Sequence, residues 1–437
     1  MVHVSMNAPT ATALVELKLN DPKRGRWVAA AQNIPVGTLV MESVPYAYVL
    51  SPSLWTERCQ VCFRAAEKLA RCSRCRLVHY CSKTCQLNDW KENHKLECPR
   101  LMNLGRLPPT SLSDMLLVGR VLRKEGRKVD GALSTRDPSA LVASDLVWFE
   151  ADRVKMEAVA GAVVQHGLAQ DSSLAHIEEM LCRFHSNNFT ITDELLLDTG
   201  AGCYPWGAMV NHSCTNNCVI TYAPTTQTLQ LRAVKPITAG DEITQPYVDV
   251  ALPRARRRET LQEHYHFACN CTRCTGDAFD DADADKDGHA VNHQDSRLRQ
   301  ADAWLEAAAS APTTYDALKL CRRALAVRQE VLSASNVLIL EVHSQLLTLN
   351  IDAGDVDGAV AAARAIHVFY DRMYEPNHAL VGLHLYTLGD LEWQAGLHDD
   401  GVRHLCEALR ILRITHGPEH SMVVALAHHI EDFQRSA

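Results

Sequence analysis

The spacing of apolar residues divides the first 250 positions into predicted strands and helices. Apolar and polar side chains partly alternate over 14–19, and a second apolar run follows a turn that contains proline and glycine. A period of two predicts short strands over 13–50. From 111 to 181 the apolar residues recur three and four positions apart, which predicts helices, and strand signals return from 188 to 250. The pattern predicts an α+β fold with strands on both sides of a helical insert.

The C-terminal third predicts a set of helical repeats. Matching residues lie 42 positions apart: Ala353-Gly354 and Ala395-Gly396, then Pro376 with His378 and Pro418 with His420. A fixed period of this size in a helical pattern indicates stacked helix-turn-helix units similar to tetratricopeptide repeats, whose usual period is nearer 34. One such unit cannot bury its apolar face alone, so the Met and aromatic residues in this part are expected in a core.

Composition and charge narrow the class of protein. No apolar run approaches 18 residues and the start lacks the regions of a signal peptide, so we expect a soluble, intracellular protein without membrane contact. The net charge of −8 argues against general affinity for nucleic acid, although Lys and Arg outnumber Asp and Glu by ten to four between Arg58 and Arg100. Six aspartates lie between Asp277 and Asp287. Within this run Asp283-x-Asp285-x-Asp287-Gly288 opens like a calcium loop, but Gln294 stands where a bidentate Glu is needed, so we expect a solvated linker there.

Eleven of the sixteen cysteines fall into clusters typical of zinc ligands, ten of them at short regular spacings. In a reducing compartment such thiols bind metals more often than they form disulfides. The first ligands form four pairs: Cys59-x2-Cys62, Cys72-x2-Cys75, Cys81-x3-Cys85 and His94-x3-Cys98. Two intervening residues allow chelation across a tight turn, and three place both ligands one turn apart on a helix. Four pairs suffice for two tetrahedral zinc ions, and spacing alone allows sequential or interleaved pairing.

A third cluster, Cys269-x-Cys271-x2-Cys274, supplies three thiolates and needs a fourth ligand from elsewhere. Cys214 and Cys218 are the candidates, and the resemblance described next favours Cys214. A catalytic zinc with bound water is the alternative, but sites made of thiolates alone are usually structural.

Three segments carry a resemblance to one family. They read SNNFTITDELLLDTGAGCYPWGAMVNHSC from Ser186, DEITQPYVD from Asp241 and HYHFACNCTRC from His264. In this order, with the Cys/His stretch 59–98 resembling a MYND module, they resemble the SMYD family of SET-domain lysine methyltransferases over nearly the whole chain. The resemblance implies a SET β-fold split by the MYND module, a knot-like threading of the NHSC segment, a post-SET zinc site and an α-helical, TPR-like C-terminal domain.

The resemblance also implies cofactors and partners. S-adenosyl-L-methionine would be the methyl donor, and a protein lysine, on a histone or a cytosolic protein, would be the acceptor. Three zinc ions per chain are expected, with interleaved coordination in the MYND module: Cys59, Cys62, Cys81 and Cys85 on one ion, and Cys72, Cys75, His94 and Cys98 on the other. MYND modules bind proline-containing peptides of partner proteins, and weak DNA contact through the basic stretch is a further option. Cytoplasm with access to the nucleus is the expected location.

Site residues are carried over by position. Tyr247 and Tyr265 match the family's active-site tyrosines. The residues expected at the donor are Arg24, Gly25 and Arg26 in the first loop, then Asn187, Asn211, His212, Tyr265 and Phe267. Free lysine has a pKa of about 10.4, and an apolar channel beside a sulfonium would lower it, so that tyrosine hydroxyls need only orient the neutral amine.

One departure from the family pattern keeps a second hypothesis open. The first loop of the family usually reads Gly-x-Gly, and here Trp27 stands at the last position. Glycine tolerates positive φ and close approach, whereas Trp adds bulk. A catalytically weak scaffold that recruits partners in transcriptional regulation is therefore the alternative to an enzyme.

These observations predict a division of the chain into seven parts: 1–58 N-terminal SET part, 59–98 MYND module, 99–181 helical insert, 182–250 SET core, 251–276 post-SET, 277–294 acidic linker and 295–437 helical domain.

Overall fold

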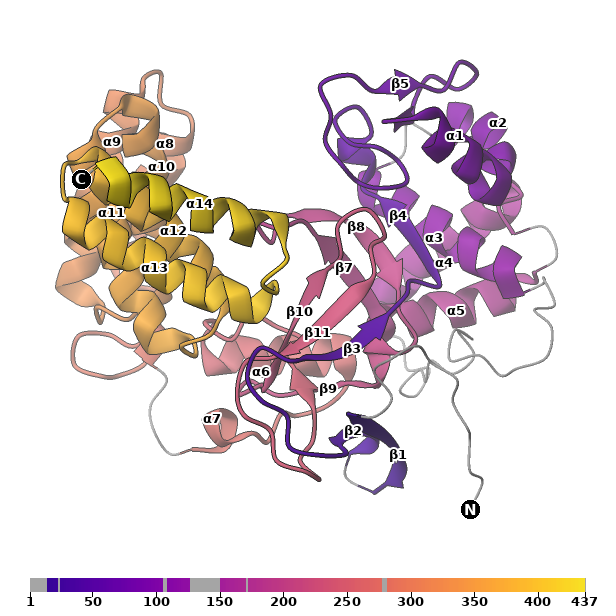
Figure 1. The fold of residues 1–437 in the computed structure, drawn as a ribbon, viewed down its shortest axis with the longest axis horizontal. Coiled ribbons are helices and arrows are strands. Elements are labelled where there is room, and N and C mark those ends of the chain that lie inside the picture. The colour runs from indigo at the N-terminus through magenta and orange to yellow at the C-terminus, as the bar shows by residue number, and fades with distance from the viewer. Residues whose placement is uncertain are drawn as a thin grey trace.

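The computed structural model describes residues 14–22, 24–104, 108–125, 150–169, 172–276 and 281–436. Parts of the predicted helical insert and of the acidic segment lie outside these ranges. Figure 1 shows small sheets in the middle of the molecule, with an N-terminal helical lobe on one side and a C-terminal helical lobe on the other. None of the described helices combines the length and apolarity needed to cross a membrane.

The central sheets join strands from both ends of the first 250 residues. One sheet has the order β10-β11-β3 and another the order β4-β8-β7, all antiparallel, while β1 pairs only with β2. The bounds are β1 Val15–Asp21, β2 Gly25–Ala30, β3 Leu39–Ser43, β4 Ala47–Leu50, β7 Asn188–Thr192, β8 Asp198–Cys203, β10 Cys218–Tyr222 and β11 Leu229–Ala233. The strands expected on both sides of the insert are therefore present, and they form common sheets.

A short parallel pair places the central motif. In this pair β9 (Asn211–His212) lies beside β12 (Thr244–Gln245), with Thr244 opposite Asn211 and Gln245 opposite His212. A parallel pair requires the chain to return in the same direction, and the returning segment here contains β10 and β11. The residues directly after β12 therefore emerge next to those after β9.

The N-terminal lobe packs helices against the second sheet. Its elements are β5 Ala70–Arg71, β6 His79–Tyr80, α1 Lys83–Asp89, η2 Trp90–His94, α2 Lys95–Leu104, α3 Pro109–Glu125, α4 Glu150–Gln165 and α5 Leu174–Asn187. Glu97 of α2 is almost completely buried and pairs with Arg120 and Arg123 of α3 at 2.8 and 2.6 Å. Because a lone buried carboxylate is costly, this ion pair fastens α2 to the helical insert.

The C-terminal lobe is a stack of helices: α8 Ser296–Ala309, α9 Thr314–Val331, α10 Val337–Ala353, α11 Val356–Met373, α12 Ala379–Gln394, α13 His398–Thr415 and α14 Ser421–Ser436. The 42-residue period has a physical cause in the helix ends. Gly354 and Gly396 follow α10 and α12 with φ of +71° and +79°, a conformation that favours glycine. The side chains of His378 and His420 accept hydrogen bonds from the backbone at the starts of α12 and α14.

The acidic segment differs from a free linker in its described part. Residues 281–294 form a bridge between Ala284 and Ala290, and Ala284 is buried. The Ala284 carbonyl accepts hydrogen bonds from Ser333 N at 3.0 Å and from Asn336 Nδ2 at 3.0 Å. These contacts pack the segment onto the turn between α9 and α10. Apolar alanines between the aspartates explain the burial that the charge pattern did not indicate.

Candidate zinc clusters and active site

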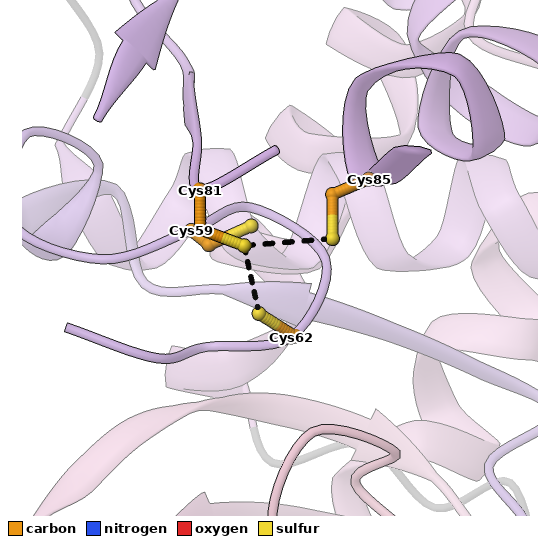
Figure 2. A group of neighbouring side chains, drawn as sticks. All are labelled: Cys59, Cys62, Cys81 and Cys85. Atoms are coloured by element: carbon orange, nitrogen blue, oxygen red, sulfur yellow. Dashed lines mark hydrogen bonds between the residues drawn. The ribbon is translucent and has the colours of Figure 1, made fainter. Parts of the chain in front are cut away.

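The first predicted zinc site brings Cys59, Cys62, Cys81 and Cys85 together, with all four sulfur atoms within 4.8 Å of one another. Figure 2 shows the side chains converging, with Cys81 Sγ 3.5 Å from Cys62 Sγ and 3.7 Å from Cys85 Sγ. Cys85 lies in α1, where the side chain of Ser82 caps the helix by accepting a hydrogen bond from Cys85 N at 3.2 Å. The cap fixes the first turn, and with it the direction of the Cys85 side chain.

The second site brings together Cys72, Cys75, His94 and Cys98, all buried. Cys72 Sγ lies 3.8 Å from Cys98 Sγ, and Cys75 Sγ lies 3.6 Å from His94 Nε2. The two MYND sites are therefore interleaved along the chain, one of the two pairings that spacing allowed. Burial raises the pKa of the Cys98 thiol to about 12, so a bound cation would be needed to favour the thiolate.

The third site resolves the choice of the fourth ligand in favour of Cys214. Its sulfur lies 4.0 Å from Cys269 Sγ and 3.5 Å from Cys274 Sγ, and Cys271 completes the group. Cys218 instead lies in β10, buried in the sheet, and is outside this group. Cys214 reaches the cluster because the chain passes the post-SET segment directly after β9.

The sulfur distances fit zinc. A tetrahedral ion with zinc–sulfur bonds of about 2.3 Å places two sulfur atoms about 3.8 Å apart. The observed separations of 3.5 to 4.0 Å agree with that value and are far from the roughly 2.05 Å of a disulfide. All four ligand positions are supplied by protein side chains at each site, which fits structural zinc better than a catalytic ion with bound water.

Tyr247 follows β12 and is held by the residues around β9. Its backbone N–H donates to His212 Nδ1 at 2.9 Å, and its hydroxyl donates to the Val210 carbonyl at 2.8 Å. Gln245 Nε2 donates to the same carbonyl at 3.0 Å. Both ends of Tyr247 are therefore tied to one short segment, which leaves its ring little freedom to move.

Aromatic rings surround this tyrosine. The ring centroid of Tyr265 lies 4.6 Å from that of Tyr247, that of His212 lies at 5.3 Å, and that of Phe267 at 6.4 Å in an edge-on arrangement. Tyr265 ends α6 (Arg254–Tyr265), and the left-handed backbone of His266, with φ of +59°, turns the chain toward Phe267 and Cys269. The rings are only part-buried, so a ligand could contact them.

Asn211 faces the N-terminal loop. Its Nδ2 donates to Glu242 Oε1 at 2.9 Å and to the Arg24 carbonyl at 3.3 Å, and Arg24 Nε lies 3.3 Å from Glu242 Oε2. Asn187 Nδ2 donates to the Arg183 carbonyl at 2.8 Å, within the last turn of α5. The neighbouring Ser186 hydroxyl donates to the His264 carbonyl at 3.0 Å, which links the end of α5 to the turn before Tyr265.

Comparison with known proteins gives relatives over most of the chain. A family model described as MYND finger matches residues 59–98. N-lysine methyltransferase SMYD2-A of Danio rerio is 27% identical over 424 residues, which cover 94% of this chain and 97% of that protein. Histone-lysine N-methyltransferase SMYD1 of Homo sapiens is 26% identical over 91% of this chain and 85% of its own length. Histone-lysine N-methyltransferase SMYD3 of Homo sapiens is 28% identical over 93% of this chain and 94% of its own length.

These three alignments cover 91 to 94% of this chain. The chain is similar to proteins of the SMYD family over most of its length. Its sheets are accordingly the SET fold of that family, interrupted by the MYND module and followed by the post-SET zinc cluster and the TPR-like helices. Among solved structures, the SET domain of LSMT bound to lysine and AdoHcy is 12% identical, covers 97% of this chain and 88% of that chain, and has a TM-score of 0.34.

The loop in which this chain departs from the family pattern is not strained at Trp27. Trp27 lies within β2 opposite Lys18, and the positive φ of the loop, +65°, is at Gly25. The guanidinium carbon of Arg24 lies 4.7 Å from the centre of the Trp27 ring. Trp27 therefore occupies an ordinary strand position and supports Arg24, so the conformational objection to the bulky residue does not apply.

Electrostatics favour orientation over proton removal in this candidate site. Burial raises the pKa of Tyr247 above its usual value, and the same cause raises the pKa of Tyr265. Both hydroxyls are therefore protonated near neutral pH. Burial lowers the pKa of His212 to about 4, so its ring is neutral.

Glu242 and Tyr374 contribute to the site and were not predicted from the sequence. Glu242 accepts hydrogen bonds from Asn211 and faces Arg24, and it lies in the quoted segment DEITQPYVD, where it could have been noticed. Tyr374, at the end of α11, donates its hydroxyl to Asp249 Oδ1 at 2.9 Å and so supports the loop after Tyr247. No local signal joins residues 125 positions apart.

A cavity of about 550 Å³ opens between α11 and α13 next to Tyr374, and none of the predicted site residues lines it.

Proposed function

We propose that this chain is an S-adenosylmethionine-dependent protein-lysine N-methyltransferase with three structural zinc ions. The observation that carries the proposal is the fixation of Tyr247 by His212 and Val210 inside the group of rings formed with Tyr265 and Phe267. The relatives named as lysine methyltransferases support the same reaction.

The methyl donor has a suitable set of residues at hand. Asn211, with the neighbouring Arg24 carbonyl and the loop Gly25–Arg26, offers polar groups, and Phe267 offers a ring face for an adenine. Asn187 is proposed to extend this set from the end of α5. When bound, the donor would supply a methyl group on positively charged sulfur, so that a neutral amine could take the methyl group while the sulfur leaves as a neutral thioether.

The tyrosines would position the lysine. The Tyr247 hydroxyl donates its proton in the hydrogen bond to the Val210 carbonyl, so the hydroxyl oxygen can accept a hydrogen bond from an amine N–H. A bond of this kind turns the nitrogen lone pair away from the tyrosine and toward the methyl group. Because the raised pKa keeps the phenol protonated, we infer that the lysine ammonium loses its proton to solvent before it reacts. Alignment of this kind lowers a barrier by several kcal/mol.

The remaining assignments belong to the same proposal. The acceptor would be a lysine of a histone or of a cytosolic protein, and the MYND module would bind proline-containing partner peptides. Weak DNA contact through the basic residues of that module is a further option. We expect the protein to be present in both the cytoplasm and the nucleus. We propose the seven domain limits that the sequence predicts.

Donor binding and methyl transfer test the proposal together. Purified protein with its zinc should bind S-adenosylmethionine in calorimetry, and it should transfer labelled methyl groups to histones or to proteins of a cell lysate. Tyr315, an exposed residue of α9, offers a matched control, since Tyr315→Phe should leave both readouts unchanged. A folded protein with three zinc ions and no donor binding would instead support the scaffold function.

A further inference from the structure

Both ring nitrogens of His212 are engaged within the protein. Nδ1 accepts the backbone N–H of Tyr247 at 2.9 Å, and Nε2 lies 3.3 Å from Cys214 Sγ. The His212 ring therefore lies between the tyrosine of the active site and a ligand of the third zinc cluster. The side chain of Asn211, the preceding residue, donates hydrogen bonds to the Arg24 carbonyl and to Glu242 instead.

The hydrogen bonds determine which nitrogen carries the proton. A backbone N–H can only donate, so Nδ1 must present its lone pair to Tyr247. In a neutral ring the proton is then on Nε2, directed at the Cys214 sulfur. A thiolate that binds zinc accepts such a hydrogen bond, and partners of this kind orient metal ligands in many proteins. The ring thus has one donor and one acceptor, and each has a partner on the correct side.

We propose that His212 is a positioning residue that couples the post-SET zinc cluster to Tyr247. Its ring would hold the Tyr247 backbone at the distance set by Cys214, which itself is fixed by Cys269, Cys271 and Cys274. Its ring would then have no free hydrogen-bonding atom for the methyl donor. The inference rests on the proposed methyltransferase function for its effect on turnover, but not for its effect on zinc and on the Tyr247 amide.

The second attachment of Tyr247 does not duplicate this link. Its hydroxyl is bonded to the Val210 carbonyl, which also accepts from Gln245, and neither residue belongs to the zinc cluster. The bond from Tyr247 N to His212 is the attachment that leads on to a zinc ligand, Cys214. Loss of the third zinc should therefore first weaken the protection of the Tyr247 backbone amide from hydrogen exchange.

Two substitutions separate the two sides of the ring. In His212→Asn the side-chain oxygen can take the place of Nδ1, since it is the same number of bonds from the backbone, while nothing reaches Cys214. In His212→Gln the amide nitrogen extends to the position of Nε2, while the acceptor for Tyr247 is lost. His212→Ala removes both contacts. His428→Gln, at an exposed histidine of α14, is the matched control.

The experiment uses full-length zinc-loaded protein and three readouts. Amide hydrogen exchange is followed over residues 244–250, zinc release to a chelator is followed with an indicator dye, and methyl transfer is measured with a peptide substrate. The phase of zinc release that is absent from Cys269→Ala identifies the third ion. His212→Asn should release this zinc about tenfold to a hundredfold faster while keeping the Tyr247 amide protected.

His212→Gln should show the opposite pattern. The Tyr247 amide should exchange faster and kcat should fall at least tenfold, with KM for the peptide and donor affinity little changed, while zinc release stays near that of the wild type. Equal zinc release in all variants, or equal exchange at Tyr247 in the Asn and Gln variants, would overturn the coupling. A wild type that transfers no methyl group would refute the proposed function, while exchange and zinc release would still decide the role of His212.

Discussion

The two zinc-binding regions are built from the same chemistry and lie in different parts of the fold. All eight ligands of the MYND module come from one stretch of 40 residues, 59–98, and they share a core with the SET strands and the helical insert. The post-SET cluster takes Cys214 from 55 positions before Cys269, and it shares a core with the C-terminal helices. Figure 1 shows α1 of the MYND module and α7 (Thr272–Thr275) of the post-SET segment well apart.

The difference teaches what each metal site can control. In the described part of the chain the hydrogen-bond contacts of the MYND ligand side chains stay within the module, so its zinc ions would stabilise a module that could bind a partner without altering the chemistry. In the post-SET cluster, Cys214 Sγ lies 3.3 Å from His212 Nε2 and Cys269 follows Phe267 by two residues, so a zinc ion there would stabilise the wall of the proposed active site. Ligand type is therefore a poor guide to function, and the surroundings of the cluster decide it.

The largest effect is expected when the third cluster is broken. Cys269→Ala should abolish methyl transfer, because the chain that carries Phe267 and Tyr265 loses its anchor. Metal analysis should fall from three zinc ions per chain to two, with both MYND ions retained. Cys72→Ala is the matched test in the other region, and it should lower transfer to a short peptide far less. If both variants lost transfer equally, the two regions would not be separable as described.

The attachment of the MYND module should be the most sensitive point for stability. Glu97→Gln leaves the buried Arg120 without its charged partner, and we expect a loss of about 3–5 kcal/mol in the free energy of unfolding. Burial by itself would raise the pKa of Glu97, but the attraction of Arg120 outweighs burial and lowers the pKa from its usual value near 4.5 to about 2. Its contribution is therefore complete above pH 4.5 and is lost as the pH falls toward 2.

Denaturant unfolding at pH 7 measures this loss where the carboxylate is fully charged. Glu259→Gln is the control, since Glu259 and its partner Arg256 are exposed and such pairs contribute about 0–1 kcal/mol. A loss for Glu97→Gln no greater than for Glu259→Gln would show that the module is held mainly by other contacts.

Within the third region, Tyr247→Phe should reduce kcat about tenfold to a hundredfold while donor affinity in calorimetry remains close to that of the wild type. The change removes one hydroxyl, and with it the hydrogen bond to Val210 and the acceptor proposed for the amine. Folding and the content of three zinc ions should be unaffected. Full activity of Tyr247→Phe would show that the active site lies elsewhere.

The smallest effect is expected at Trp27. Because the ring supports Arg24, whose carbonyl accepts from Asn211, Trp27→Gly should weaken donor binding about twofold to fivefold, the size of an exposed cation–π contact. Trp27→Phe should retain most of the affinity. Tighter donor binding by Trp27→Gly would mean that the indole occupies space that the donor needs.

Much of this molecule could be predicted from local patterns. The spacing of Cys and His indicated two complete zinc sites, because their ligands lie within a few turns of chain and the geometry of each pair is local. The 42-residue period indicated stacked helices, because Gly354 and Gly396 end helices and His378 and His420 begin them by local bonds. Strand alternation indicated both halves of the sheet region for the same reason.

Other features depended on contacts between distant segments. Interleaving of the MYND pairs and the choice of Cys214 over Cys218 require the path of the chain, since both alternatives satisfy the same spacing. The burial of the acidic segment depended on its packing against the turn before α10. The link from Cys214 through His212 to Tyr247 exists because β9 and β12 run in parallel and place their following residues side by side. Local chemistry thus determined which groups the protein has, and tertiary structure decided which of them meet, because the distance between two side chains depends on the whole path of the backbone between them.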